Sequence, residues 1–371
     1  MTAPPPPTSG PQAGDAQAVL TIDLGALAHN WRQLAMRVAP ATCAAVVKAD
    51  AYGIGIEAAV PALISAGCKV FFVAQVSEGR RVRALDPQVE IYVLNGLLPG
   101  AVEICRDLKL RPVLGSLADA RLWAAGGRGA PCALHFDTGM NRLGADPEEI
   151  PAIAALPLHP SLVMTHFVAS ENADDPLNAL QIERFERMRS MLPAVRASLS
   201  NSSAIFLPER PFGDLVRPGY ALYGGNPTPG FDNPMRPVVR LDAPILQMRV
   251  IEAGQKVGYN AQWTAKRRTR LATIGIGYAD GLPRQAMATD ARDGGEAIVA
   301  GHRCSFAGRI SMDLTVIDIT DVPEAEIGPE TQACLLGPEI SIDDLGAKAG
   351  TIGYEILTRL GQRYHRIYVR E

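Results

Sequence analysis

A lysine stands at the point where a buried strand is expected to end. The stretch ATCAAVVKADAYGIG at residues 41–55 begins with small and apolar residues, reaches Lys48, and continues into a turn that contains Tyr52 and two glycines. A short apolar run bounded by glycine is typical of a buried strand. A lysine desolvated at a strand end loses its proton easily and can form a Schiff base. The alternative is a solvated turn residue, which is the commoner state of a lysine.

Polar and glycine residues follow other strand-like runs in the first 225 residues. Each has a purely structural alternative: His166 as a satisfied core histidine, Arg217 as the partner of a buried carboxylate, and Asn201 with Ser202 as an Asx or ST turn. Their common placement after successive strands favours a shared site. The set comprises Lys48, Tyr52, Asp137, Arg142, His166, Asn201, Ser202, Arg217, Gly219 and Tyr220.

Two pairs of residues in this set suit a phosphate. Small residues with free backbone N–H groups can surround an anion, and Asn201-Ser202 and Gly219-Tyr220 are such pairs. Pyridoxal phosphate carries both an aldehyde and a phosphate, so it would use the lysine as well as these pairs. The residue types therefore point to pyridoxal phosphate as a cofactor.

A unit of a short β-branched run, a turn and a segment of helical periodicity recurs from residue 40 to about residue 225. Eight such alternations predict a (β/α)8 barrel of the TIM type, whose site lies at the C-terminal ends of the strands. An open doubly wound sheet is the competing architecture, because the third, fourth and seventh runs are weak. The runs are Ala44–Val47, Val70–Ala74, Glu90–Leu94, Pro112–Leu114, Ala133–Phe136, Leu162–His166, a stretch near Leu199, and Asp214–Leu222.

The sequence changes character after about residue 230. Consecutive β-runs such as TRLATIGIGYADG and DLTVIDIT follow with little helix between them, which predicts a separate β domain. The expected organisation is a disordered tail at 1–17, the barrel at 18–232, and a mostly β C-terminal domain at 233–371. Residues 18–24 are a candidate strand of the β domain. The tail is rich in Pro, Gly and Ser, which bury little surface.

Composition narrows the class of partner. The formal net charge is −3 with acidic and basic residues interspersed, which does not favour nucleic acid. Six cysteines without a CxxC pair and six histidines without HxH or HExxH spacing predict neither a disulfide framework nor a metal site. The sequence shows no signal-peptide pattern and no apolar run of about 18 residues. We expect a cytoplasmic protein that acts on a small molecule.

Nine motifs, taken in order, resemble those of the alanine racemase family. The resemblance spans nearly everything after the tail. It implies a pyridoxal-phosphate-binding barrel with a C-terminal β domain, racemisation of alanine, and a head-to-tail homodimer with shared active sites. The motifs are AVVKADAYG at 45–53, DTGMNRLG at 137–144, MTHF at 164–167, NS at 201–202, VRPGYALYG at 216–224, VGYNAQWTA at 257–265, GYADGLPR at 277–284, GRISMD at 308–313 and TIGYE at 351–355.

The resemblance implies two catalytic residues, Lys48 and Tyr259, and two residues that bind the cofactor ring, Arg217 and His166. Lys48 holds pyridoxal phosphate as an internal aldimine, and Tyr259 is the base on the opposite face. Arg217 faces the pyridine nitrogen, and His166 lies by the ring in a hydrogen-bonded line with Tyr259. Because the pKa of a guanidinium exceeds 12, Arg217 cannot readily protonate the ring, which favours simple reprotonation at Cα.

The resemblance also implies binding roles. Arg142 and the Met312 backbone approach the substrate carboxylate, and Tyr259 and Met312 reach the barrel of the partner subunit. Residues matching cofactor-binding positions are Tyr52, Asn201, Ser202, Gly219, Tyr220 and Tyr354. Residues in supporting or entrance positions are Tyr278, Arg284, Arg309 and Asp313.

Four positions depart from the commoner family pattern. His135 replaces a lysine that many members carry as a carbamate, and a histidine cannot supply that negative charge to orient Arg142. Ile54 stands where a histidine is usual, Ser311 where a cysteine is common, and Gly353 where an asparagine is common. His135 therefore leaves substrate selectivity open.

The predicted function is interconversion of L- and D-alanine by two bases, Lys48 and Tyr259, either to supply D-alanine for peptidoglycan or to serve alanine breakdown. One alternative is a broad-specificity amino-acid racemase of the same fold. A decarboxylase of related architecture would carry a glutamate where this chain has Arg217. A non-catalytic pyridoxal-phosphate-binding protein would lack the C-terminal β domain.

Overall fold

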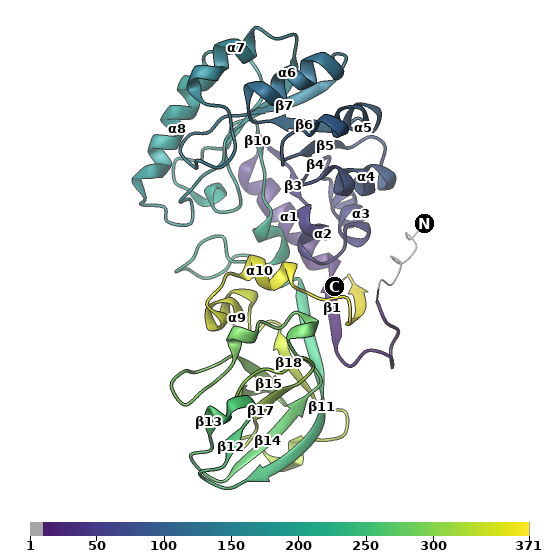
Figure 1. Cartoon of the computed structure of the whole chain (residues 1–371), viewed down its shortest axis with the longest axis vertical. Coiled ribbons are helices and arrows are strands. Elements are labelled where there is room, and N and C mark those ends of the chain that lie inside the picture. Colours follow the sequence, from purple (N-terminus) through teal and green to yellow (C-terminus); the bar gives the residue numbers. More distant parts are fainter. Residues whose placement is uncertain (1–9, 371) are drawn as a thin grey trace. The chain divides into compact units, whose positions relative to one another are not determined.

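The computed structural model describes residues 10–370, and the chain divides into two compact units (Figure 1). Of the described residues, one unit comprises residues 27–236, and the other joins residues 10–26 to residues 237–370. Each unit has its own buried core. Within residues 10–370, no helix is both long and apolar enough to cross a membrane.

The unit of residues 27–236 is built on a curled parallel sheet with helices between its strands (Figure 1). The sheet has seven strands in sequence order. They are β3 (Ala45–Val46), β4 (Val70–Val73), β5 (Glu90–Val93), β6 (Arg111–Leu114), β7 (Pro131–His135), β8 (His159–Met164) and β9 (Ala197–Ser198). The helices are α1 (Leu24–Val38), α2 (Lys48–Tyr52), α3 (Ile56–Ala66), α4 (Val76–Leu85), α5 (Val102–Asp107), α6 (Leu117–Gly126), α7 (Ile150–Ala154) and α8 (Pro176–Arg189).

A two-stranded sheet connects the two ends of this curl. Strand β10 (Leu215–Val216) pairs in parallel with β2 (Thr42–Cys43), which directly precedes β3 in the chain. Beside β9, the Asp214 N–H donates to the Ala197 carbonyl at 2.8 Å, and the Arg217 N–H donates to the Ser200 carbonyl at 2.9 Å. Backbone hydrogen bonds therefore continue from β9 through β10 to β2, as the barrel prediction requires.

The predicted strands are found, with two differences in extent. The sixth run ends as a strand at Met164, so His166 lies in the loop beyond β8. The eighth run, expected over 214–222, is a strand only at Leu215–Val216, because Pro218 and Gly219 turn the chain into a short 3₁₀ helix, η4 (Tyr220–Tyr223). Strands buried on both faces are apolar throughout, as all four residues of β4 are.

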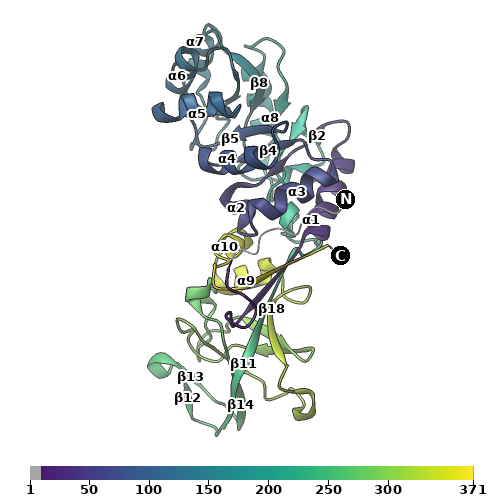
Figure 2. The same cartoon turned by 90° about the vertical axis from the view of Figure 1, so that its right-hand side faces the viewer.

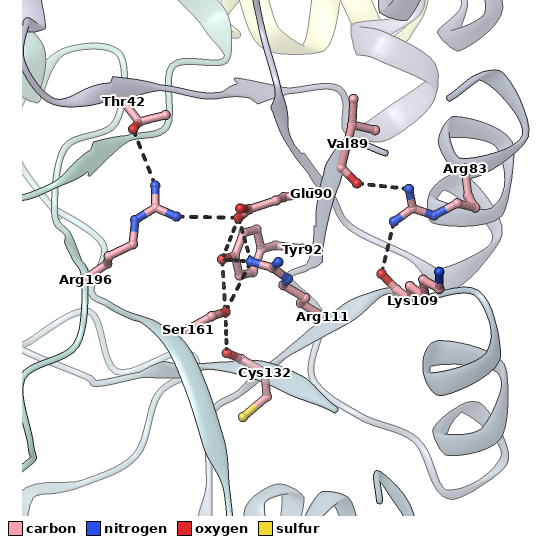
Figure 3. Close-up of polar contacts among 10 residues, drawn as sticks. All are labelled: Thr42, Arg83, Val89, Glu90, Tyr92, Lys109, Arg111, Cys132, Ser161 and Arg196. Carbon is pink, nitrogen blue, oxygen red and sulfur yellow. Dashed lines mark hydrogen bonds and ion pairs between the residues drawn. The ribbon is translucent and has the colours of Figure 1, made fainter. Parts of the chain in front are cut away.

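A polar network joins the N-terminal ends of several strands (Figure 3). Figure 3 shows Glu90 between two arginines: its Oε2 accepts from Arg111 Nη1 at 2.6 Å and lies 3.5 Å from Arg196 Nη1. Arg111 also donates to the Tyr92 hydroxyl at 2.9 Å, which lies 3.1 Å from Ser161 Oγ. One carboxylate thus ties together residues of β5, β6, β8 and the segment before β9.

Arg83 of α4 fastens the same end of the unit through backbone carbonyls (Figure 3). Its Nε and Nη2 donate to Leu108 and Lys109, at 2.9 and 3.0 Å. Its Nη1 donates to Asp86 and Val89, at 3.2 and 2.9 Å. A single guanidinium therefore caps the ends of α4 and α5 beside the starts of β5 and β6.

The second unit contains a mixed β-sheet and two short helices (Figure 2). Strand β11 is its longest, pairing with β1 and β18 in its first half and with β14 in its second. The strands are β1 (Val19–Asp23), β11 (Val239–Ile251), β12 (Lys256–Val257), β13 (Trp263–Thr264), β14 (Thr269–Ile274), β15 (Glu296–Val299), β16 (His302–Ser305), β17 (Thr315–Asp318), β18 (Gln332–Leu336) and β19 (His365–Val369), with helices α9 (Ile342–Ala349) and α10 (Gly353–Thr358).

The N-terminal segment contributes to this second unit. β1 pairs antiparallel with β11 and parallel with β19. Before it, the Pro11 carbonyl lies 3.1 Å from His365 Nδ1. The rest of the expected tail, residues 1–9, lies outside the described residues.

The Glu90 network gives a prediction about stability. Glu90→Gln leaves Arg111 and Arg196 facing each other without the carboxylate, so we expect the free energy of unfolding to fall by about 1 kcal/mol, a value limited by partial exposure. The surroundings of Lys48 should not change, because Glu90 begins β5 whereas Lys48 follows the other end of β3. Thermal unfolding checks this, with Glu103→Gln, an exposed carboxylate, as the control. Equal melting temperatures for the two variants would contradict it.

Candidate active site

Lys48 lies just beyond the end of β3, separated from it by Val47. Its environment favours the neutral amine. Burial, together with the positive charge of Arg142, lowers the pKa of Lys48, while the carboxylate of Glu78 acts in the opposite direction. A lysine whose charged form is destabilised is a better nucleophile and base near neutral pH.

The turn after Lys48 has an uncommon backbone. Ala49, Asp50, Ala51 and Tyr52 all have positive φ, between 52° and 55°. Left-handed geometry costs a residue with a Cβ roughly 1–2 kcal/mol, so four in succession require strong support from their surroundings. Several backbone hydrogen bonds close the turn, among them those from the Gly53 N–H to the Ala49 carbonyl at 2.9 Å and from the Gly55 N–H to the Asp50 carbonyl at 2.9 Å.

The left-handed turn brings Tyr52 back into the interior. Its side chain is buried and its ring stacks on Tyr223, with centroids 4.5 Å apart. The Tyr223 hydroxyl in turn donates to the Val46 carbonyl at 3.0 Å, next to the start of the turn. Tyr52 is thereby fixed close to Gly219, where a Cβ would lie only 2.4 Å from the Tyr52 hydroxyl oxygen. Only glycine fits there.

Ser202 and the backbone around Gly219 form a compact polar group. Ser202 Oγ accepts from the Gly219 N–H at 3.0 Å and from the Ala221 N–H at 3.2 Å. Asn201 has a structural contact instead, because its Oδ1 accepts from the Ala204 N–H at 2.9 Å and from Ser170 Oγ at 3.0 Å. The group therefore combines a hydroxyl, the Tyr52 phenol and several backbone N–H groups beside one glycine.

Arg217 is buried and is held by neutral oxygens. Its Nη1 donates to the Ser198 carbonyl at 2.9 Å and to Ser198 Oγ at 2.5 Å. Its Nη2 donates to the carbonyls of Thr165 at 2.6 Å and Leu199 at 3.3 Å. Among residues 10–370 it forms no ion pair, so the structure does not support the buried-carboxylate alternative. Burial lowers the pKa of Arg217 to about 9.

Two histidines near Arg217 are neutral at physiological pH. Burial and the charge of Arg217 lower the pKa of His166 to about 3 and that of His135 to about 4. Both rings therefore act as neutral hydrogen-bonding groups rather than as cations.

The loop that carries Arg142 is shaped by Asp137. Asp137 Oδ1 accepts from the N–H groups of Gly139 and Met140, both at 2.8 Å, and its Oδ2 accepts from the Asn141 N–H at 2.7 Å. Arg142 itself is exposed. The charge of Arg142 contributes to the pKa shifts of Lys48 and both histidines, so it lies within electrostatic reach of them.

A buried amide links this loop to the His166 segment. Gln181 Nε2 donates to Thr138 Oγ1 at 2.9 Å and to the His166 carbonyl at 3.0 Å, and its Oε1 accepts from the Val168 N–H at 2.9 Å. Thr138 Oγ1 also lies 2.7 Å from Thr165 Oγ1. Sequence reasoning missed Gln181, although a polar residue on the same helical face as Phe185 and Met188 is a detectable signal.

The remaining expected site residues belong to the second unit, where several occupy neighbouring loops. The Tyr278 N–H donates to the Ser311 carbonyl at 3.1 Å, and the Met312 carbonyl accepts from the Ala279 N–H at 2.9 Å. Tyr259 follows Gly258, where a Cβ would lie 3.2 Å from the backbone nitrogen of Arg309. The loops of Tyr259, Tyr278 and Met312 therefore lie close together.

The other expected residues of this unit either bond to neighbouring side chains or belong to elements other than the loops of Tyr259, Tyr278 and Met312. Arg309 Nε donates to Gln262 Oε1 at 2.8 Å, and Asp313 accepts from Arg363 Nη1 at 2.8 Å. Arg284 begins a separate short 3₁₀ helix, η7 (Arg284–Ala286), and Tyr354 lies in α10. Within residues 10–370 there is no group of three or more His, Cys, Asp or Glu residues able to hold a metal ion.

Family models match both units. The model described as "Alanine racemase, N-terminal domain" matches residues 22–227, and "Alanine racemase, C-terminal domain" matches residues 238–368. The chain belongs to the alanine racemase family. Alanine racemase of Methylobacterium sp. (strain 4-46) is 52% identical over 360 residues, covering 95% of this chain and 98% of that protein.

Relatives named for different roles and a solved structure agree with this assignment. The biosynthetic and catabolic alanine racemases of Agrobacterium fabrum are 43% and 42% identical, covering 94% and 96% of this chain and 93% and 94% of those proteins. Alanine racemase of Bartonella henselae with covalently bound pyridoxal phosphate superimposes with a TM-score of 0.89 at 37% identity, covering 95% of this chain and 100% of that chain.

Two departures from the commoner alanine racemase pattern have a structural account. Ile54 is completely buried, where an apolar side chain needs no hydrogen-bonding partner. His135 is neutral and therefore provides no anion for Arg142. Nothing in the structure explains Ser311 or Gly353.

The lowered pKa of His135 predicts a pH dependence of stability. In the unfolded chain His135 takes up a proton below about pH 6.5, whereas in the folded chain His135 stays neutral down to about pH 4. Because the unfolded state then binds more protons, the free energy of unfolding should fall as the pH is lowered through this window. His135→Asn should make this decline shallower. Urea unfolding between pH 6.5 and pH 4 tests the prediction, with the exposed His159→Asn as control. Equal pH slopes in the two variants would contradict it.

Proposed function

We propose that this chain interconverts L- and D-alanine with pyridoxal phosphate, using Lys48 and Tyr259 as the two groups that exchange the Cα proton. The observation that carries the proposal is Lys48: a half-buried lysine just after a strand, whose pKa burial lowers, within the domain matched by the alanine racemase family. The activity and the cofactor follow from family membership, and the role of each residue is our assignment.

The donor set in the barrel unit fits pyridoxal phosphate. The space beside Gly219 is closed to any Cβ and bordered by the Tyr52 hydroxyl, as expected where a backbone must approach an anion closely. Ser202, Gly219, Tyr220 and Tyr52 would hold the phosphate, and Lys48 Nζ would hold the aldehyde carbon. When bound, the cofactor withdraws electrons from the Cα–H bond of an attached amino acid.

Arg217 would meet the pyridine nitrogen. Its four hydrogen bonds come from Nη1 and Nη2, and all go to neutral oxygens, so the guanidinium keeps its full positive charge. Even with its pKa lowered to about 9, it stays protonated near neutral pH and donates a hydrogen bond without giving up the proton. Arg217 would therefore leave the ring nitrogen unprotonated, which would limit side reactions at the cofactor.

Substrate binding would use Arg142 and the Met312 backbone. Arg142 is exposed, and within residues 10–370 its side chain forms no hydrogen bond or ion pair, so its donors are available to a carboxylate. Met312 lies on the loop held against Tyr278. Together they would orient the Cα–H bond between the two bases.

Lys48 and Tyr259 would act on opposite faces of Cα. Removal of the proton on one face and its return on the other inverts the configuration, so neither group alone suffices. His166 is neutral, so one ring nitrogen accepts a hydrogen bond and the other donates one. It can therefore link Arg217 to a tyrosine without adding a charge. Tyr259 is 68% exposed in the single chain.

A head-to-tail homodimer would complete each site. Tyr259, Met312 and Leu314 are 68%, 54% and 39% exposed, and Leu143 beside Arg142 is 46% exposed. Large apolar side chains grouped near functional residues are expected to be covered by a partner. In this arrangement Tyr259 and Met312 of one subunit serve Lys48 of the other.

The physiological role would be cytoplasmic supply of D-alanine for peptidoglycan or breakdown of alanine. His135 favours a second candidate, a racemase of wider substrate range, because no carbamate anion orients Arg142. Racemisation of a panel of amino acids in heavy water separates these two: exchange confined to alanine supports the first, and comparable exchange of larger side chains supports the second.

The assignment of Lys48 gives the most direct test of the site. The purified protein should be yellow, and borohydride should fix the cofactor to the peptide containing Lys48, detected by mass spectrometry. Lys48→Ala should abolish covalent trapping, whereas Lys69→Ala, an exposed lysine before β4, should not. Trapping at another lysine would reject the assignment.

Mixing two inactive variants tests the shared site. Lys48→Ala and Tyr259→Phe subunits, unfolded and reassembled together, should form mixed dimers with one intact site. Random pairing predicts recovery of about a quarter of the wild-type activity. Reassembly of either variant alone should give none. Failure to recover activity, with mixed dimers shown by native mass spectrometry, would contradict sharing between subunits.

A further inference from the structure

The left-handed turn after Lys48 is braced by the neighbouring helix. Four consecutive residues with positive φ are not stable on their own, and the turn's internal hydrogen bonds do not reach its first N–H group. That group and the Asp50 carboxylate both bond to α4, which packs against α2 and α3. α4 therefore contributes contacts to an element that lies one βα unit earlier in the chain.

Glu78 holds the beginning of the turn. Its Oε1 accepts from the N–H of Ala49, the residue after Lys48, at 2.6 Å. Its Oε2 accepts from the N–H groups of Ala74 and Gln75, at 2.8 and 3.1 Å. The second pair caps the N-terminus of α4, which is a common task for a glutamate at this position. The first bond reaches the adjacent loop and has no part in capping.

Arg81 holds the middle of the turn from the same face of α4, three residues after Glu78. Its Nη2 lies 2.5 Å from Asp50 Oδ1 and 2.5 Å from Glu57 Oε2, and its Nε donates to Glu57 Oε1 at 2.7 Å. Asp50 Oδ1 also accepts from the Ile56 N–H at 3.1 Å, across the turn. The turn is thus fixed at both Ala49 and Asp50, directly after Lys48.

We propose that Glu78, assisted by Arg81, is a positioning residue for Lys48: by binding the Ala49 N–H, its carboxylate fixes the left-handed turn and hence the place from which the lysine reaches the cofactor and Cα. This rests on the assignment of Lys48 above. The competing view is that Glu78 only caps α4, in which case its loss would affect stability without changing the conformation of the Lys48 turn.

Glu78→Gln and Glu57→Gln form a matched pair. Each removes one carboxylate charge from the packed helices α3 and α4, but only Glu78 bonds directly to the backbone of the Lys48 turn. We expect Glu78→Gln to speed cofactor release from the holoenzyme by about tenfold or more, since a neutral amide has one acceptor oxygen and cannot accept from both Ala49 and the N-terminus of α4. Amide hydrogen exchange in residues 47–56 should rise, and kcat should fall while the KM for alanine stays near wild type. Glu57→Gln should change none of these appreciably.

A variant with a shorter carboxylate separates the effect of side-chain length from the effect of charge. Glu78→Asp keeps the negative charge and a short capping carboxylate at α4, but it is one methylene too short to reach Ala49. It should reproduce the effects of Glu78→Gln with a melting temperature near wild type, and it serves if Glu78→Gln does not fold. Cofactor release, exchange in residues 47–56 and kcat equal to those of Glu57→Gln would overturn the proposal. Absence of borohydride trapping at Lys48 in the wild type would instead reject the site assignment.

Discussion

The left-handed turn after β3 is the constraint on which the rest of the barrel site depends. The four residues with positive φ end at Tyr52, whose ring stacks on Tyr223. From there its hydroxyl occupies the space that a Cβ on Gly219 would need. One backbone conformation thereby relates the lysine, the phenol and the glycine to one another. The unfavourable local energy is offset by contacts from α4 and from the core.

The second organising feature is electrostatic. Lys48, Arg142 and Arg217 influence the same region, while the two histidines near them are neutral and Arg217 is bonded only to neutral oxygens. A region with excess positive charge and few compensating carboxylates is suited to anions. The proposed ligands supply two, a phosphate and a substrate carboxylate. The same surroundings destabilise the protonated form of Lys48, which the proposed chemistry requires.

Much of the fold could be predicted from the sequence because strand-like runs and helical periodicity alternate regularly. The positions after strands could be predicted for the same reason, since polar residues such as Lys48 and Arg217 interrupt apolar runs. The extent of β10 could not be predicted, because apolar residues resume at Tyr220–Leu222 and only Pro218 and Gly219 mark the end of the strand. The left-handed geometry of the turn after Lys48 could not be predicted either. Ala49 and Ala51 have no intrinsic preference for positive φ, and Asp50 adopts it only occasionally as a single residue, so the run of four depends on tertiary contacts.

The supporting residues were the hardest to foresee. Glu78 has the sequence pattern of a helix cap, and its bond to Ala49 depends on the packing of two βα units. Gln181 joins loops that are separated in sequence by more than twenty residues, and only its place on the buried face of α8 hinted at a role. Asn201 shows the reverse case, because a motif residue has its side-chain oxygen directed into local structure. Contacts of this kind depend on tertiary packing and cannot be inferred from the sequence.

Proton exchange at Cα, followed separately for each enantiomer in heavy water, tests the central claim most directly. If Lys48 and Tyr259 serve opposite faces, Tyr259→Phe should lose exchange from one enantiomer of alanine far more than from the other. Lys48→Ala, supplied with pyridoxal phosphate, should show the opposite preference. Normal exchange of both enantiomers by either variant, or loss of the same enantiomer by both, would contradict the two-base account.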